Sequence, residues 1–378
     1  MRAVGLLICA VAAGCTFSPP RTNDDGGVVP IDQPMPDAPS CFGQGFGQIC
    51  LASPPTQGRT VQSTIDTSAD TACDEIVRLN GIEVCAITGT SVDVAVTSLV
   101  RGVGSRPIVI VASGSISIAG TLDVGSQRGG RAGAGAQGET CAGLEAARGD
   151  DGGGGGGAGG SYFGAGGDGG TGDLNSNGLP PGVGLGGIHA PAFTPTAVRA
   201  GCRGGNGGNG GSGSTSGGGG RGGGALYMIA GAEIRISGRV MSYGAGGAGA
   251  TVQGGAGGGG SGGLIGLDAP SVNISGFLAA NGGGGGEGAG LDSGVSGEDG
   301  TIDASRAAGG IALMNDGGSN DGGNGGKGSG GTELSGDKGG DNNGGAGGGG
   351  GGAGLIYVKG TLTLTGLASP APMQVPRS

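Results

Sequence analysis

Few residues in this chain of 378 have the types and the spacing that binding or catalysis requires. The clearest group places oxygen donors at every second position in Asp173-Leu-Asn175-Ser-Asn177-Gly, which matches the first half of a calcium-binding loop. The last ligand of such a loop is a bidentate acid, and this chain has Gly184 there. Asp173, Asn175 and Asn177 are therefore a candidate weak calcium site, and an Asn/Gly-rich turn is the alternative.

Catalytic groups are harder to find. His189 follows Gly-Gly-Ile without a Ser or Cys nucleophile motif beside it, as a loop histidine would. Enzymes that cleave polysaccharides set their acids on one face of neighbouring strands. The strand acids of this chain, Asp123, Glu233 and Asp268, do not occupy equivalent positions. We expect no catalytic residue and no cofactor, and keep a polysaccharide lyase or hydrolase as the alternative.

The first residues are typical of an export signal. Arg2 gives a positive start, and the apolar run from Val4 to Ala13 is too short to span a hydrocarbon core of ~30 Å. The run ends Val11-Ala-Ala-Gly-Cys15, which resembles the bacterial lipobox. The resemblance implies cleavage after Gly14 and lipid attachment to Cys15.

The segment behind Cys15 is rich in proline and aspartate and has almost no apolar pattern. Such a segment buries too little surface to offset its chain entropy, so residues 15–40 are predicted to be a disordered tether. A tether behind a lipid-bearing cysteine is what a surface lipoprotein needs. We expect an exported, lipid-anchored protein of the outer membrane or cell surface.

Eight cysteines occur in the chain. Cys9 would leave with the signal and Cys15 would carry lipid, so six remain, and an even number in an exported chain predicts disulfides. Sequence alone leaves every pairing open; joining neighbours along the chain gives Cys41–Cys50, Cys73–Cys85 and Cys141–Cys202. No C-x₂-C pair is present, so a zinc site is not expected.

Composition narrows the class of protein. Glycine provides 107 residues and comes in runs, which excludes collagen. The runs crowd three stretches, at about 129–224, 244–263 and 281–354. The net charge of −10 argues against nucleic acid as a partner.

Between the glycine runs lies a repeat. Copies begin at Ile108, Leu226, Leu264 and Leu355, and a looser copy contains Val92. Each copy is an apolar strand, a small-residue bend, and then an apolar-x-apolar-x-Gly pattern of period two, which buries its face only by stacking on the next copy. The prediction is an all-β fold, a small parallel β-helix or β-solenoid with long Gly-rich loops. Unrelated strands in a sandwich are the alternative.

The predicted organisation has five parts along the chain. They are a lipoprotein signal peptide (1–14), the tether (15–40), a disulfide-linked N-terminal cap (41–86), the solenoid with its three Gly-rich insertions (87–368) and a tail (369–378).

The glycine tracts allow two structures. Ordering the ten residues from Asp151 to Gly160 would cost ~10–20 kcal/mol of backbone entropy, and they have few side chains to bury. Mobile chain is therefore the default expectation. A polyglycine-II-like bundle, in which strands without side chains approach closely and bond through their backbones, is the alternative.

The whole layout resembles Gly-rich bacterial surface lipoproteins of unknown function, called PGRS-like from their composition. The shared features are the lipobox, Cys41-Phe-Gly, Cys50-Leu-Ala, the Ile-x-Ile-x-Gly strands and the glycine tracts. The resemblance implies location and architecture and no activity. We expect a non-catalytic surface lipoprotein with a structural or adhesive role in the cell envelope. Its partners would be the membrane, through the lipid anchor, and a glycan or protein of the envelope or cell exterior.

Overall fold

The computed structural model describes residues 40–137, 141–142, 144, 147–178, 182–311 and 321–377. The predicted signal peptide, Cys15 and nearly all of the tether lie outside these residues. The described chain is all-β: it has no α-helix, and only two short 3-10 helices, at Gly45–Gly47 and Asp70–Ala72.

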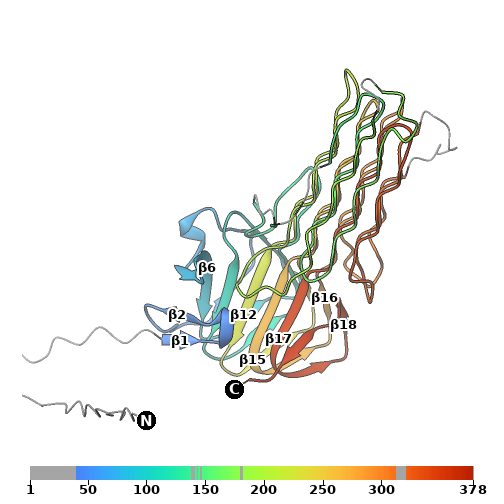
Figure 1. Ribbon diagram of the computed structural model, residues 1–378. Helices are drawn as coiled ribbons and strands as arrows, with labels where there is room; N and C mark the ends of the chain where they lie inside the picture. Colours follow the sequence, from blue (N-terminus) through green and yellow to red (C-terminus); the bar gives the residue numbers. More distant parts are fainter. Residues whose placement is uncertain are drawn as a thin grey trace, which may run out of the picture. The chain divides into compact units, whose positions relative to one another are not determined.

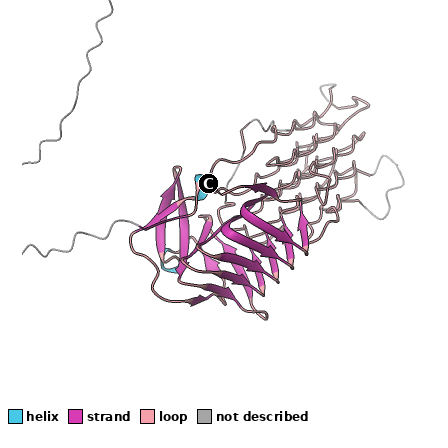
Figure 2. Cartoon of the chain, turned by 90° about the horizontal axis from the view of Figure 1, so that it is seen from below, coloured by secondary structure: helices cyan, strands magenta, loops and turns pink. Residues whose placement is uncertain are grey.

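The strands form two sheets, one of 11 strands that curls and one of 6 (Figures 1 and 2). All pairs in them are parallel except β5 with β6. The hairpin β1 (Ser40–Phe42) and β2 (Ile49–Leu51) is separate from both. The larger sheet contains β3 (Arg59–Thr60), β5 (Glu75–Leu79), β6 (Ile82–Gly89), β7 (Val92–Val94), β9 (Ile108–Ala112), β10 (Ile116–Ile118), β12 (Ala225–Ala230), β13 (Glu233–Ile236), β15 (Leu264–Ile274), β17 (Leu355–Leu364) and β19 (Met373–Val375). The smaller sheet contains β4 (Ile65–Asp66), β8 (Leu99–Val103), β11 (Thr121–Asp123), β14 (Arg239–Met241), β16 (Phe277–Ala279) and β18 (Leu367–Ser369).

The second half of each repeat lies in the register that its pattern predicts. Ile116 pairs with Val92 on one side and with Ile234 on the other, and Val272 continues the row. The repeat glycine sits at the corner that follows, where a Cβ at Gly238 would lie 1.9 Å from the carbonyl oxygen of Gly120. The repeat keeps glycine there because successive turns of chain touch.

The first half differs from the predicted alignment by one residue. Leu226 pairs with Ile108 as expected, but its partner on β15 is Ile265 rather than Leu264. The reason is that β9 is buried on both faces: Ile110 packs in the core between the sheets, whereas Val109 packs in a second core on the outer side. A strand apolar on both faces has no alternation from which to read its register.

The glycine tracts are ordered rods that run side by side away from the strands (Figure 1). Residues 255–263 form a central rod, whose N–H groups turn in order to three neighbours. Gly255 and Gly258 bond to rod 201–210, Ala256 and Gly259 to rod 345–354, and Gly257 to rod 244–250. A return to the same neighbour every third residue is the geometry of polyglycine II, which has three residues per turn.

The carbonyl groups of the central rod receive bonds from three further rods. Gly157 donates to Ala256, Gly220 to Gly258 and Gly286 to Gly257. The central rod thus has neighbours on all sides, and its main chain is bonded in every direction. Two excursions of the chain, 124–224 and 280–354, supply most of these neighbours.

Close approach makes glycine necessary in the rods. A Cβ at Gly258 would lie 2.0 Å from the carbonyl oxygen of Ala158, and one at Gly259 would lie 2.1 Å from that of Gly283. The default expectation of mobile tracts is therefore wrong for the described residues. It counted side chains as the only means of offsetting chain entropy, whereas here main-chain hydrogen bonds do so.

The strands also extend beyond the range assigned to the solenoid. β3 pairs with β7, and β4 with β8, so residues before 87 already belong to the sheets. In the region expected to be a tail, β19 pairs with β17.

Candidate functional site

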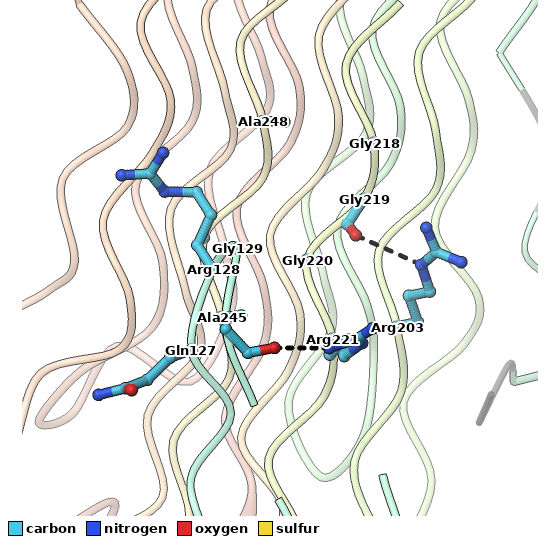
Figure 3. A pocket seen from close by; sticks show the side chains of 12 residues that line it. Gln127, Arg128, Gly129, Arg203, Gly218, Gly219, Gly220, Arg221, Ala245 and Ala248 are labelled. Carbon is cyan, nitrogen blue, oxygen red and sulfur yellow. Dashed lines mark hydrogen bonds between the residues drawn. The ribbon is translucent and has the colours of Figure 1, made fainter. Parts of the chain in front are cut away.

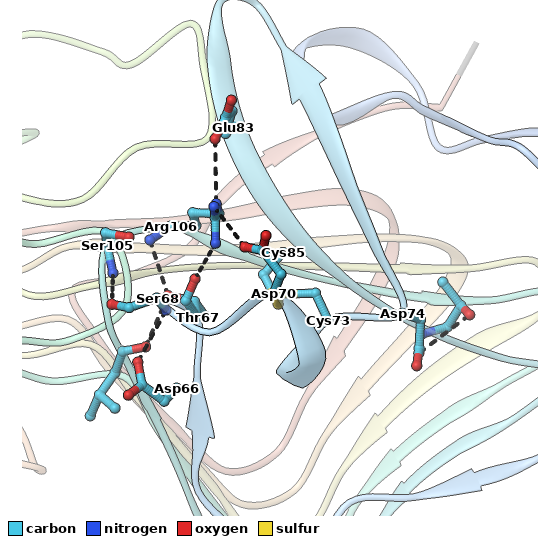
Figure 4. The surroundings of a disulfide bond; sticks show 12 residues. Asp66, Thr67, Ser68, Asp70, Cys73, Asp74, Glu83, Cys85, Ser105 and Arg106 are labelled. Atoms are coloured by element: carbon cyan, nitrogen blue, oxygen red, sulfur yellow. Dashed lines mark hydrogen bonds and ion pairs between the residues drawn. A yellow bond between two sulfur atoms is a disulfide. The ribbon is translucent and has the colours of Figure 1, made fainter.

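Three disulfides join Cys41 to Cys50, Cys73 to Cys85 and Cys141 to Cys202, the pairs that the neighbour rule gives. The surroundings of Cys73–Cys85 explain how the first turns of the sheets are fixed (Figure 4). Arg106 reaches the carboxylates of Asp70 at 3.0 Å and Glu83 at 3.4 Å, and donates to the Thr67 carbonyl at 2.8 Å. Arg106 thereby links the segment of Thr67 and Asp70 to Glu83 on β6.

The candidate calcium loop is a turn whose acid is engaged by its own backbone. Asp173 is fully buried, and its two carboxylate oxygens accept the N–H groups of Asn177 and Gly178, each at 3.2 Å. Asn175 and Asn177 are exposed. These contacts satisfy Asp173 as a turn residue, the alternative interpretation of this sequence.

His189 has an acidic partner, which the sequence did not predict. Its Nδ1 lies 2.7 Å from Oδ1 of Asp168, and the same oxygen accepts the His189 main-chain N–H at 3.0 Å. No hydroxyl or thiol among the described residues hydrogen-bonds to the ring. The pair orients the imidazole and fastens the segment after rod 184–188 to rod 166–172.

The three strand acids, Asp123, Glu233 and Asp268, each form an ion pair with a different arginine. Asp123 is buried and forms an ion pair with Arg131, and Glu233 pairs with Arg235 at 3.0 Å. Burial raises the pKa of Asp123, and the Arg131 guanidinium opposes that rise. Within the described parts of the chain, no three His, Cys, Asp or Glu side chains are grouped to hold a metal ion.

Asp268 fastens the start of the described chain to its end. It is fully buried on β15; its Oδ2 accepts the N–H of Gln44 at 2.7 Å, and its Oδ1 lies 3.0 Å from Nε of Arg377. Burial raises the pKa of Asp268, against the lowering effect of these two partners. The ring of Phe46 packs at 5.5 Å from that of Tyr227. The hairpin β1–β2 is thereby fixed to the outer face of the larger sheet.

Some of the turns that join the rods, such as 301–305, lie beside the strands, whereas others lie at the end of the bundle far from the strands (Figure 1). We call this end the tip; its described turns are 173–178, 211–215, 251–254, 290–293 and 341–344. Neighbouring turns bond to one another: Thr251 exchanges main-chain bonds with Thr215, and Gln253 donates to Gly290. The tip is therefore a joined surface rather than a set of independent loops.

Aliphatic side chains project from three turns of this tip. The exposed fractions are 51% for Leu174, 42% for Val252 and 68% for Leu291. Val252 and Gln253 have φ of 42° and 58°, in the left-handed region. A β-branched residue is disfavoured there by ~1–2 kcal/mol. The chain thus keeps an apolar side chain at a position where glycine or asparagine would be less strained.

Sequence reasoning missed this surface, because each aliphatic residue is isolated in a glycine-rich stretch and only the pairing of rods brings them to one end. The signal that was available is an aliphatic residue flanked by turn-forming residues, as in Leu291-Asp-Ser-Gly.

No helix among the described residues is long and apolar enough to cross a membrane. In comparisons with known proteins, no family model, no curated protein and no solved structure matches this chain.

Proposed function

We propose that this chain is a non-catalytic lipoprotein of the bacterial cell surface, and that its glycine bundle carries an adhesive tip away from the membrane. The proposal combines the lipobox at Cys15 with the position of the exposed aliphatic residues. The single observation that carries it is the joined tip surface with Leu174, Val252 and Leu291 exposed.

The architecture suits this role. In this proposal, the two sheets form a short β-solenoid, and the solenoid is the base from which the bundle projects. Glycine predominates in the rods, and the tip adds exposed aliphatic side chains from three turns that lie at one end of the bundle. Because neighbouring rods bond to each other along their length, the turns keep their relative positions, and little conformational entropy is lost when a partner binds.

The partner that fits the tip is an apolar patch on a protein of the envelope or cell exterior. Three exposed aliphatic side chains favour burial against a similar surface, at ~1.5–3 kcal/mol for each fully buried side chain. The five described turns have no aromatic ring that would stack on a sugar. A glycan partner is the other outcome of the test below.

The alternative is an enzyme that acts on polysaccharide. It would need at least two carboxylates free to face one substrate. Asp123, Glu233 and Asp268 each have a cationic partner, and Asp268 is covered by the hairpin β1–β2. These contacts support the non-catalytic proposal.

The adhesive role is tested in cells that display the full chain, by counting the cells retained on a surface coated with envelopes from the same strain lacking the gene. Replacing Leu174 and Leu291 by Ser and Val252 by Asn should lower retention at least ~10-fold, since several kcal/mol of apolar burial is lost. The matched control replaces exposed aliphatic residues of the strand region, Val96, Leu99 and Leu364, by Ser. Equal retention of both variants would rule out the tip as the adhesive surface.

Treating the coated envelopes with protease or with glycan-cleaving enzymes then separates a protein partner from a glycan. The anchor is tested independently by Cys15→Ser, followed by lipid labelling and fractionation. Unchanged membrane association would contradict lipid attachment without bearing on the tip.

A further inference from the structure

A pocket of about 370 Å³ lies at the foot of the bundle, near the points where its rods leave the strands. Its most distinctive feature is three arginines from different segments: Arg128 follows β11, Arg203 begins rod 201–210, and Arg221 lies on rod 216–224 (Figure 3). Gln127 adds a side-chain amide, and glycine backbone forms most of the remaining wall.

None of these guanidinium groups contacts a carboxylate of the described chain. Arg221 donates to the Gly130 carbonyl at 2.9 Å, and Arg203 to the Gly219 carbonyl at 3.3 Å and to Oδ1 of Asn206 at 3.1 Å. The Arg128 side chain has no hydrogen-bond or ion-pair partner among the described residues. Carboxylates are bound elsewhere, by Arg59, Arg106, Arg131, Arg235, Arg306 and Arg377.

One acid is attached to the pocket wall. Oδ1 of Asp299 accepts the main-chain N–H of Arg128 and that of Gly246, each at 2.9 Å. Its position fixes the loop that presents Arg128. The pocket is therefore lined by three positive charges and has one acid bonded to its wall, although the whole chain has a net charge of −10.

The pocket wall also has room for a side chain at one glycine of a rod. Most rod glycines have no room for a side chain, yet a Cβ at Gly218 would meet nothing within 4 Å. Gly218 lies on the pocket wall, and its φ is not in the left-handed region. The pocket is thus open to solvent at Gly218, on the same rod as Arg221.

We infer that this pocket binds an oxyanion carried by a ligand of about monosaccharide size. The planar guanidinium fork matches the two oxygens of a carboxylate or a phosphate, and charge-assisted bonds are the stronger kind. The walls are polar backbone and open to solvent, which suits a hydrated sugar acid better than an apolar molecule. The shared chemistry is the oxyanion, whose source is either the carboxylate of a uronic acid or the phosphate of a phosphorylated sugar.

The test is calorimetric titration of the full chain with three probes: glucuronate, glucose 6-phosphate and uncharged glucose. At least one anionic probe should bind and glucose should not, and added salt should weaken binding because the groups are exposed. The tighter of the two anions identifies the source. Binding of glucose as tight as that of the anions, or no binding of either anion, would overturn the inference.

Variants locate the site. Arg128→Gln and Arg203→Gln should each weaken anion binding ~10-fold or more, the value of one hydrogen bond to a charged group. Gly218→Glu adds a negative charge at the pocket wall, at a position where a Cβ would meet nothing within 4 Å, and should abolish binding with little change in the melting temperature. Arg78→Gln removes an exposed arginine from β5 as the matched control and should have no effect. Anion binding that survives Gly218→Glu would place the anion elsewhere.

Discussion

The strand region and the glycine bundle both form main-chain hydrogen bonds between neighbouring segments. They differ in whether side chains fill the space between those segments. In the strands, Ile116, Ile234 and Val272 stack in one row and are completely buried. In the bundle, rods approach until a Cβ at Gly258 would lie 2.0 Å from a neighbouring carbonyl oxygen. The strands are stabilised by the apolar volume they bury, and the bundle by hydrogen bonds that only the absence of side chains permits.

The difference implies that the two regions fail under opposite changes. Loss of a methyl group harms the strand core, where it leaves a cavity. Addition of a methyl group harms the bundle, where it forces rods apart. Each of the following predictions tests this contrast.

The largest effect is expected from Gly258→Val in the central rod. The new side chain would separate this rod from rod 153–160 and weaken the bonds of Gly258 with Gly205 and Gly220. Overpacking and lost hydrogen bonds together should lower the free energy of unfolding by about 4 kcal/mol. Denaturant unfolding measures this change.

Gly218→Ala is the control for that variant, since it adds a methyl group to the bundle where space is free. It should leave stability unchanged or raise it by about 0.5 kcal/mol, through the restricted unfolded chain. Equal destabilisation by both variants would show that close approach is not what requires glycine.

The strand core should respond to the reverse change. Ile234→Ala removes apolar volume between Ile116 and Val272 and should lower the free energy of unfolding by about 3 kcal/mol. A decrease in the free energy of unfolding no larger than that of a typical exposed substitution would show that Ile116, Ile234 and Val272 are not packed together. In this variant, hydrogen exchange should increase most at the amides of β10 and β13.

Val252→Asn at the tip should increase stability, unlike Gly258→Val and Ile234→Ala. Asparagine tolerates the left-handed conformation, so relief of strain should raise the free energy of unfolding by about 1 kcal/mol. The same variant should reduce cell retention, because the apolar contact is lost. A variant that is both more stable and fully adhesive would separate the strain from the adhesive role.

The smallest effect is a pH dependence of opposite sign in the two regions. Burial raises the pKa of Asp123 above 3.8, so the folded state binds the proton more tightly than the unfolded state. The stability that this group contributes falls as pH rises from 3.8 through the folded pKa. In the bundle, bonds from the Ser305 hydroxyl and N–H lower the pKa of Asp303, so its contribution is lost as pH falls below 3.8.

Melting curves of Asp123→Asn and Asp303→Asn against pH test both signs. Relative to the unmodified chain, Asp123→Asn should gain stability with rising pH and Asp303→Asn should lose it. The same slope for both would contradict the assignment of burial as the cause in one region and hydrogen bonding in the other.

What the sequence could predict follows the same division. The sequence predicts the row Val92, Ile116, Ile234 and Val272, because polar residues alternate with apolar ones on strands buried on one face. In the first half of the repeat, the predicted alignment differs from the observed pairing by one residue, because Ile108-Val-Ile-Val is buried on both faces and has no alternation that fixes its register. The sequence does not predict which rods are neighbours, since a glycine run has no side chains to specify its partner.

The contacts of the candidate sites were the least predictable. Asp268 meets Gln44, which is 224 positions away in sequence, and no local pattern marks either residue. The cluster of Arg128, Arg203 and Arg221 likewise depends on the pairing of rods. Asp173 and Glu233 have local side-chain contacts, to the N–H groups of Asn177 and Gly178 and to Arg235, and for Asp173 a local motif marks the turn.

The threefold rotation of hydrogen-bond partners along each rod also sets how the length of the bundle can change. Three residues added to each leg of the excursion 244–263 would leave every existing donor facing its present neighbour. They would move the turn at Val252 outward by ~9 Å. One or two residues would instead rotate the rest of the rod toward the wrong partners. Insertions and deletions in this gene should therefore be tolerated in whole turns, so that the reach of the protein varies in discrete steps.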